Sequence, residues 1–165
     1  MNMLRLLKHS FSFGLKSRIL FPKKSLAKIT EAVKISEGKH RGEIRVCIES
    51  ALTPVQIIRG FTGRDRAVDV FSQLRVWDTE ENNGVLIYLL IADHDIEILA
   101  DRGVVRNAPD AFWKNICETI ETKFRAKQFE EGILMAIDHI GKLLEEKYPK
   151  NGYDQNELPD SPHLI

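Results

Sequence analysis

Acid and amide side chains flank both ends of one apolar stretch of this chain, NNGVLIYLLIADHDIEILAD (Asn82–Asp101). Hard cations such as Ca²⁺ and Mg²⁺ prefer the oxygen atoms of carboxylates and amides as ligands. A candidate cation site is therefore formed by Asp78, Asn82, Asn83 and Asp101. Arg66 and Arg102 are candidates to hold the oxygens of a phosphate or another anionic substrate, because guanidinium groups bind such oxygens in pairs.

The same residues also fit ordinary turn chemistry. Asn82 and Asn83 tolerate a left-handed backbone, Gly84 relieves crowding, and Asp101 with Arg102 would form a surface ion pair. The DxDxDG spacing of an EF-hand loop is missing, as are the P-loop, GxGxxG, HExxH and GxSxG motifs. The residues alone therefore leave a cation site and a simple turn open, and they mark no catalytic nucleophile.

The elements that must position these residues follow from the periodicity of apolar side chains. Helices are expected from Ser25, a good N-cap, to about residue 38, over 54–59, along the stripe Ala67–Trp77, from Pro109 to about Phe124, and over 129–147. Strands are expected at 43–50, 84–92 and 96–101. Residues 102–109 read as a loop, and the Pro-, Asn- and Asp-rich tail 150–165 as extended or disordered.

The order of these elements predicts an α/β fold, a three-layer α/β/α sandwich with a small mixed β-sheet flanked by helices. The helical connection between strands 43–50 and 84–92 favours a parallel pair, and strand 96–101 returns as a hairpin partner. One sheet edge then holds Glu49, Ser50 and the hairpin tip 93–95, which we interpret as a turn. The opposite edge brings Asn82 and Asn83 next to Asp101, although they lie far apart along the hairpin.

Charge divides the chain, whose formal net charge is zero. Residues 1–30 carry seven Lys or Arg and no acid. Within this region, residues 1–22 form a basic arm with apolar side chains at Leu4, Leu7, Phe11 and Leu15. The arm has three interpretations: an amphipathic helix packed on the domain, a peripheral membrane or partner contact, or a leader segment. No apolar run is long enough to span a membrane, and no basic stripe indicates nucleic-acid binding.

Cys47 and Cys117 lack the spacing of a disulfide framework or a zinc site. We interpret both as small buried hydrophobic residues of a cytoplasmic protein, with membrane association through the arm as an alternative. The expected division is the arm 1–22, a domain 23–149 and the tail 150–165.

Three segments resemble the TPM domain, a family named after a thylakoid lumen protein, a photosystem-repair protein and a receptor modulator. They are GEIRVCIES, the run from Arg66 to Val104 and FEEGILMAIDHIGKLLEEKYP. The resemblance covers residues 23–149 and is greatest to the short, stand-alone bacterial form, which also carries a basic leading segment and a NELPD-type tail.

The resemblance implies an α/β/α sandwich that binds a divalent cation, calcium above all, and an acid phosphatase activity claimed for a plant member. The matching positions here are Thr79, Asn83 and Gly84 before the central strand, and Asp101, Arg102 and Gly103 after the hairpin. The leading hypothesis is a binding module for calcium or magnesium that engages a protein partner. The alternatives are a metal-assisted phosphatase and a scaffold without ligand.

Overall fold

The computed structural model describes residues 3–12, 16–152 and 155–165, so Leu15 of the arm lies outside it. Its strands are β1 (Glu43–Glu49), β2 (Gly84–Leu90), β3 (Asp95–Ala100) and β4 (His163–Leu164). Its α-helices are α1 (Met3–Ser10), α2 (Lys16–Leu20), α3 (Lys23–Glu37), α4 (Pro54–Ile58), α5 (Gly63–Gln73), α6 (Arg102–Asn107), α7 (Asp110–Arg125) and α8 (Phe129–Lys147). A short 3₁₀ turn, η1 (Ile91–Asp93), joins β2 to β3.

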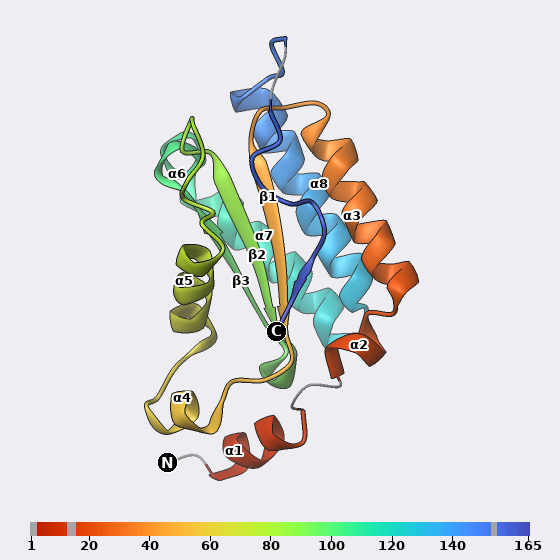
Figure 1. Ribbon diagram of the computed structural model, residues 1–165, viewed down its shortest axis with the longest axis vertical. Helices are drawn as coiled ribbons and strands as arrows, with labels where there is room; N and C mark the ends of the chain where they lie inside the picture. Colours follow the sequence, from red (N-terminus) through yellow and green to blue (C-terminus); the bar gives the residue numbers. More distant parts are fainter. Residues whose placement is uncertain (1–2, 13–15, 153–154) are drawn as a thin grey trace.

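The architecture is an α/β/α sandwich around a mixed sheet with the strand order β3-β2-β1-β4 (Figure 1). As expected, β1 and β2 are parallel and β2 and β3 form an antiparallel hairpin. Alternate residues of the strands point to opposite faces. Ile44, Val46 and Ile48 pack with α3, α7 and α8, whereas Cys47 packs on the face covered by α4 and α5.

Several boundaries differ from the expectations. Helix α3 begins at Lys23 behind Pro22, so Ser25 is not its N-cap and its buried hydroxyl makes no hydrogen bond. Helix α5 ends at Gln73, because Arg75 takes a left-handed backbone, and Trp77 is exposed. The expected loop after β3 contains α6, which Asp101 caps.

The two cysteines are both free thiols. Cys47 is buried as expected, and its burial raises the pKa of the thiol to about 12. Cys117 lies on α7 and is only half-buried, although it packs against the core.

The tail supplies the fourth strand of the sheet, which the sequence analysis did not predict. β4 pairs in parallel with β1, and Ile165 exchanges backbone hydrogen bonds with Ile48 and Ser50, each at 3.0 Å. The side chain of Leu158 is buried in the core on the α5 side. The described part of the tail is therefore extended, as one of the two alternatives stated, and it is part of the folded domain.

Buried charges on β1 explain why the tail lies there. The Glu43 carboxylate accepts hydrogen bonds from the backbone N–H groups of Glu157 and Leu158, both at 3.1 Å, and Arg45 donates to two carbonyls of the tail. Without these partners the two buried side chains would each leave an unsatisfied charge, which is strongly destabilising. All seven residues of β1 are buried, including the three charged ones.

The basic arm packs on the domain through α1, which is the first of the three interpretations. Arg5 donates to the carboxylate of Asp93 at 2.8 and 3.0 Å and to the Phe61 carbonyl at 2.7 Å. The buried ring of His9 lies between Asp93, 3.0 Å from Nε2, and the N–H of Leu52, which donates to Nδ1 at 2.9 Å. Burial alone would raise the pKa of Asp93, but the hydrogen bonds from Arg5 and His9 outweigh it and lower that pKa.

We expect Asp93→Asn to release α1, because the variant keeps the shape of the side chain and loses its charge. Hydrogen bonds to charged groups contribute about 2 kcal/mol, so amide hydrogen exchange over residues 3–10 and at Leu52 should accelerate roughly 30-fold. The matched control is Asp138→Asn, which breaks an exposed ion pair on α8. Unchanged exchange over residues 3–10 would show that Asp93 does not hold the arm.

A second prediction concerns Glu37 at the end of α3. The pKa of this carboxyl is raised to about 9, chiefly by burial and also by nearby Glu43 and Asp160, although the hydrogen bond from the Ile44 N–H lowers it. In the unfolded chain the same group loses its proton near pH 4.5. Glu37 therefore favours the folded state most at low pH, and this contribution decreases as the pH rises from about 4.5 towards 9.

The Glu37→Gln side chain cannot ionise, so this variant should not lose stability in the way that the wild type does as the pH rises. The free energy of unfolding is measured in urea at several pH values. Between pH 5 and pH 8, we expect the wild type to lose at least about 1 kcal/mol of stability relative to Glu37→Gln. Glu31→Gln, on the exposed side of the same helix, is the control. A pH profile of Glu37→Gln parallel to that of the wild type would contradict a proton held on Glu37.

Candidate functional site

The two polar ends of the β2–β3 hairpin lie side by side, as the topology predicted. Asp101 donates its N–H to the carbonyl of Gly84 at 2.8 Å. Gly103 donates its N–H to the carbonyl of Asn82 at 3.0 Å, and the Arg102 Nε donates to the Asn82 side-chain oxygen at 3.0 Å. These bonds join the loop before β2 to the start of α6 into one sheet edge, defined by Asn82, Asn83 and 101–103, at the upper end of Figure 1.

Asn83 lies inside this edge and is only 1% exposed. Its backbone N–H donates to the Thr79 hydroxyl at 3.0 Å, and its side-chain amide donates to the Arg41 carbonyl at 2.7 Å. These contacts fix the orientation of the amide. Its oxygen, Oδ1, is buried and has no hydrogen-bond partner.

Asp101 is held in an equally defined position because it caps α6. One carboxylate oxygen, Oδ1, accepts the N–H of Arg102 at 2.6 Å. A negative charge at a helix N-terminus is favourable. The other oxygen, Oδ2, is buried and again has no hydrogen-bond partner.

The two unsatisfied oxygens are the most informative feature of this edge. Among the described residues only three buried side-chain polar atoms lack a partner, and two of them belong to Asn83 and Asp101. A buried acceptor without a partner costs about 1–3 kcal/mol. Both oxygens lie on segments joined by hydrogen bonds, and a cation or a water molecule is the kind of group that satisfies such acceptors.

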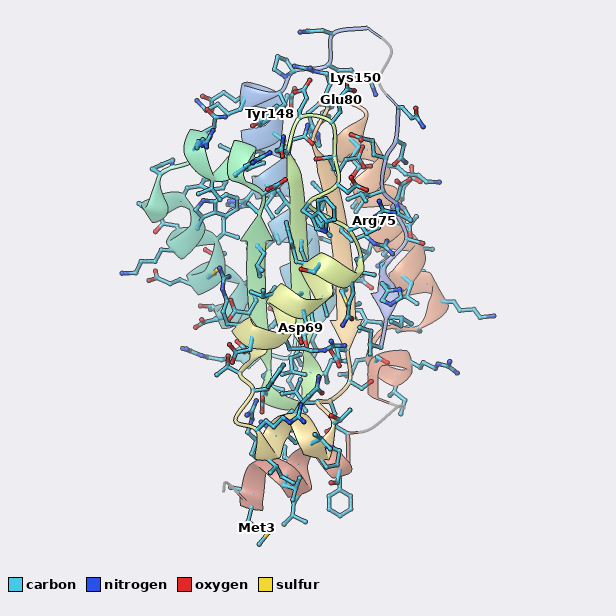
Figure 2. All side chains as sticks on the ribbon, turned by 60° about the vertical axis from the view of Figure 1, so that its left-hand side comes forward. Met3, Asp69, Arg75, Glu80, Tyr148 and Lys150 are labelled. Carbon is cyan, nitrogen blue, oxygen red and sulfur yellow. The ribbon has the colours of Figure 1, made fainter. Side chains whose placement is uncertain are left out.

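Backbone carbonyls crowd the same place. A Cβ atom on Gly103 would lie 2.5 Å from the Asn82 carbonyl oxygen and 2.9 Å from both the Glu81 carbonyl oxygen and the Tyr148 hydroxyl. Only glycine allows this close approach. Figure 2 shows Tyr148 and Glu80 together at this end of the molecule, with Met3 at the opposite end.

Asp78 and Asn82 contribute less than the sequence suggested. Asp78 is exposed, pairs with Arg75 and faces a shallow cavity lined by Glu80 and Glu157. Asn82 adopts a left-handed backbone with φ of 53°, which the turn interpretation predicted, and Arg102 occupies its side-chain oxygen. The structure therefore brings Asn82, Asn83, Asp101 and Arg102 together and directs Asp78 elsewhere.

Arg66 lies far from this edge, near the other end of β1. Its Nε binds the Glu49 carboxylate at 2.8 and 3.2 Å, and the Tyr88 hydroxyl donates to the same carboxylate at 2.8 Å. All three side chains are buried. In this structure Arg66 neutralises a buried acid and is not available to an anion at the Asp101 edge.

The carboxyl ends of β1 and β2, where open α/β sheets often bind ligands, are covered by the arm. Ser50 donates its hydroxyl to that of Ser17 at 2.9 Å, and Asp93 is bound by Arg5 and His9. The tip 93–95 is thus a turn, as expected, and also the anchor of α1. Sequence reasoning missed Arg5 and His9, although their spacing of four residues places both on one face of a helix.

Within residues 3–12, 16–152 and 155–165, no group of three or more His, Cys, Asp or Glu side chains is arranged to hold a metal ion. A cation at the Asp101 edge would therefore rely on one carboxylate, an amide and carbonyl oxygens. In the same part of the chain, no helix is long and apolar enough to cross a membrane.

Comparison with known proteins identifies the family. The model of the TPM domain matches residues 18–143. The structure is similar to that of the BA42 protein from the psychrophilic bacterium Bizionia argentinensis, with 30% identity, a TM-score of 0.76, and coverage of 86% of this chain and 93% of that one. This chain therefore belongs to the TPM domain family.

A second solved structure supports the fold alone. It is the N-terminal domain of a protein from P. gingivalis, with 15% identity, a TM-score of 0.60, and coverage of 81% of this chain and 83% of that one. The search of curated proteins found no match.

The crowding at Gly103 yields a test of the edge. Gly103→Ala should lower the free energy of unfolding by about 1–3 kcal/mol, because its methyl group would displace backbone carbonyls. Gly38→Ala is the control, since its Cβ would meet nothing closer than 3.4 Å and its backbone is helical. Equal stability of the two variants in urea denaturation would contradict the close approach.

Proposed function

We propose that this TPM domain is a binding module that holds a divalent cation, calcium or magnesium, at the edge formed by Asn83 and Asp101 and presents that edge to a protein partner. One observation carries the proposal: Asn83 Oδ1 and Asp101 Oδ2 are buried oxygens without a partner on two segments tied together by hydrogen bonds. Of the four candidate ligands, these two fit a hard cation.

The supporting chemistry is that of irregular oxygen sites. Calcium accepts carboxylate, amide and backbone carbonyl oxygens together with water, whereas magnesium requires a nearly ideal octahedron. A site with one carboxylate and fixed carbonyls suits calcium better, and its low charge implies weak binding. A bound cation would neutralise the Asp101 carboxylate and remove the cost of the two unsatisfied oxygens.

The edge can also transmit binding to the surface. Asp101 caps α6, and Asn82 binds the exposed side chain of Arg102. Because both loops share these contacts, a ligand at Asp101 would order the loop before β2 and the start of α6 together. We infer that a protein partner binds this surface.

A phosphatase is the alternative function, and fewer contacts support it. Arg102 lies beside Asp101 and would bind phosphate oxygens, but Arg66 is engaged by Glu49. A metal-assisted phosphatase requires the cation to activate a water molecule at this edge. Hydrolysis of p-nitrophenyl phosphate that Asp101→Asn abolishes would favour the enzyme over the binding module.

Calcium binding is tested by titrating the ¹⁵N-labelled protein with CaCl₂ and with MgCl₂. We expect amide shift changes at Glu81–Gly84 and Asp101–Gly103, and a higher affinity for calcium. Asp101→Asn keeps the helix cap and loses the charge, so it should weaken binding at least about tenfold. The control Asp78→Asn should bind within about twofold of the wild type.

Three outcomes would contradict the proposal. No shift at millimolar calcium would leave a bound water as the partner of the two oxygens. Shifts confined to Asp78, Glu80 and Glu157 would place the ion in the open acidic cavity. A melting temperature unchanged by both calcium and phosphate would favour the scaffold without ligand, because a native-state ligand raises stability by mass action.

A further inference from the structure

Helix α1 is amphipathic, but its apolar side faces away from the protein. Arg5 and His9 point inward to Asp93, and Leu6 packs against the core. In contrast, Leu4 is 77% exposed and Phe11, just after the helix, is 84% exposed. Surface helices normally place the apolar stripe against the core and the charges in water.

Two other helices at this end of the molecule also expose apolar side chains. Helix α4 packs against α1 and exposes Val55 and Ile58, and α2 exposes Ile19 and Leu20. Of the thirteen large apolar residues that are exposed in the described part of the chain, eight belong to this group: Met3, Leu4, Leu7, Phe11, Ile19, Leu20, Val55 and Ile58. We call these eight residues the apolar pole.

The pole lies at one end of the molecule. In Figure 1, α1, α2 and α4 all lie in the lower part, and Figure 2 places Met3 at the extreme of the same end. The sheet edge that contains Asn83 and Asp101, near Tyr148, is at the opposite end. Scattered exposed apolar side chains are normal, but such a concentration on one end marks an interaction surface.

The segments that carry the pole have charges of one sign. Residues 1–30 and 50–64, which contain α1, α2 and α4, include nine Lys or Arg and no Asp or Glu. Arg18, Lys23, Lys24 and Arg59 are exposed. The acid of the hairpin tip that lies against α1, Asp93, is engaged by Arg5, His9 and Lys8.

We propose that the apolar pole is a docking surface for a membrane that contains anionic lipids. Exposed leucine and phenylalanine side chains on segments that carry lysine and arginine but no acid match an anionic bilayer surface, into which apolar side chains enter at the headgroup boundary while the basic groups bind lipid phosphates. A second copy of the chain fits less well, because two such poles would bring like charges together. The protein docks on the membrane surface without inserting a helix across it. Docking does not involve the sheet edge that contains Asn83 and Asp101.

The contact between α1 and the hairpin tip gives this surface its orientation. Because Arg5 and His9 hold the polar side of α1 against Asp93, Leu4, Leu7 and Phe11 face outward without any rearrangement. Preorganised apolar side chains lose less conformational entropy when they dock. Docking on the membrane would leave the Asn83 and Asp101 edge directed away from the bilayer.

The test is co-sedimentation of the full chain with vesicles of phosphatidylcholine alone and of phosphatidylcholine with 30% phosphatidylglycerol, a composition chosen as roughly that of an anionic membrane surface. We expect binding to the anionic vesicles that weakens as salt is added. Leu4→Ser/Phe11→Ser should reduce the partition coefficient at least about tenfold with an unchanged melting temperature, since both side chains are exposed.

Matched variants separate the apolar and electrostatic contributions. Ile35→Ser/Val68→Ser removes two exposed apolar side chains from α3 and α5, outside the pole, and should bind like the wild type. Lys23→Gln/Lys24→Gln should weaken binding on the order of tenfold and flatten the salt dependence.

Three results would overturn the proposal. The first is no binding to anionic vesicles. The second is equal binding by Leu4→Ser/Phe11→Ser and the wild type. The third is a wild-type dimer in light scattering that Leu4→Ser/Phe11→Ser converts to a monomer while neither protein binds vesicles, which would assign the pole to a second copy of the chain. All these variants leave Asn83 and Asp101 intact, so failure here is separable from failure of the cation site.

Discussion

The burial of three charged side chains on β1 is the constraint on which the rest of this structure depends. Glu43, Arg45 and Glu49 lie on one face of a central strand that is covered on both sides. A buried ion is tolerated only with partners, and the partners here come from segments far from β1 in the sequence. The tail supplies backbone N–H groups and carbonyls to the first two, and Arg66 of α5 supplies a guanidinium to the third. The tail and α5 are thus positioned by charge as well as by apolar packing.

The sheet that results has two structurally different ends. At one end the arm covers the carboxyl ends of the parallel strands and turns the apolar side of α1 to the outside. At the other end the hairpin closes on itself and leaves two oxygens of Asn83 and Asp101 without partners. The proposed cation site and the proposed membrane surface lie at opposite ends and use separate residues. A TPM domain built in this way would hold the sheet edge of Asn83 and Asp101 at a distance from a membrane on which it docks.

Local pattern predicted much of the fold and part of the candidate site. Alternation in 43–50 and the apolar run 84–92 indicated the parallel pair, and the hairpin geometry then placed Asn83 beside Asp101. The two-residue strand β4 carries no periodicity, so only the buried charges on β1 reveal its position. Asp78 turned away because α5 ends four residues earlier than its apolar stripe, at Gln73. The burial of Arg66 was predictable from the sequence, because this residue lies next to the apolar Ala67 and Val70 on the inward face of α5.

We propose that the two unsatisfied oxygens of the sheet edge, Asn83 Oδ1 and Asp101 Oδ2, bind a cation. The most direct measurement is a crystal structure of the protein in millimolar CaCl₂, with the ion identified by anomalous scattering. We expect a calcium ion about 2.3–2.6 Å from both Asp101 Oδ2 and Asn83 Oδ1. A water molecule bridging the same two oxygens, or a calcium ion bound at Asp78 and Glu157 instead, would contradict it.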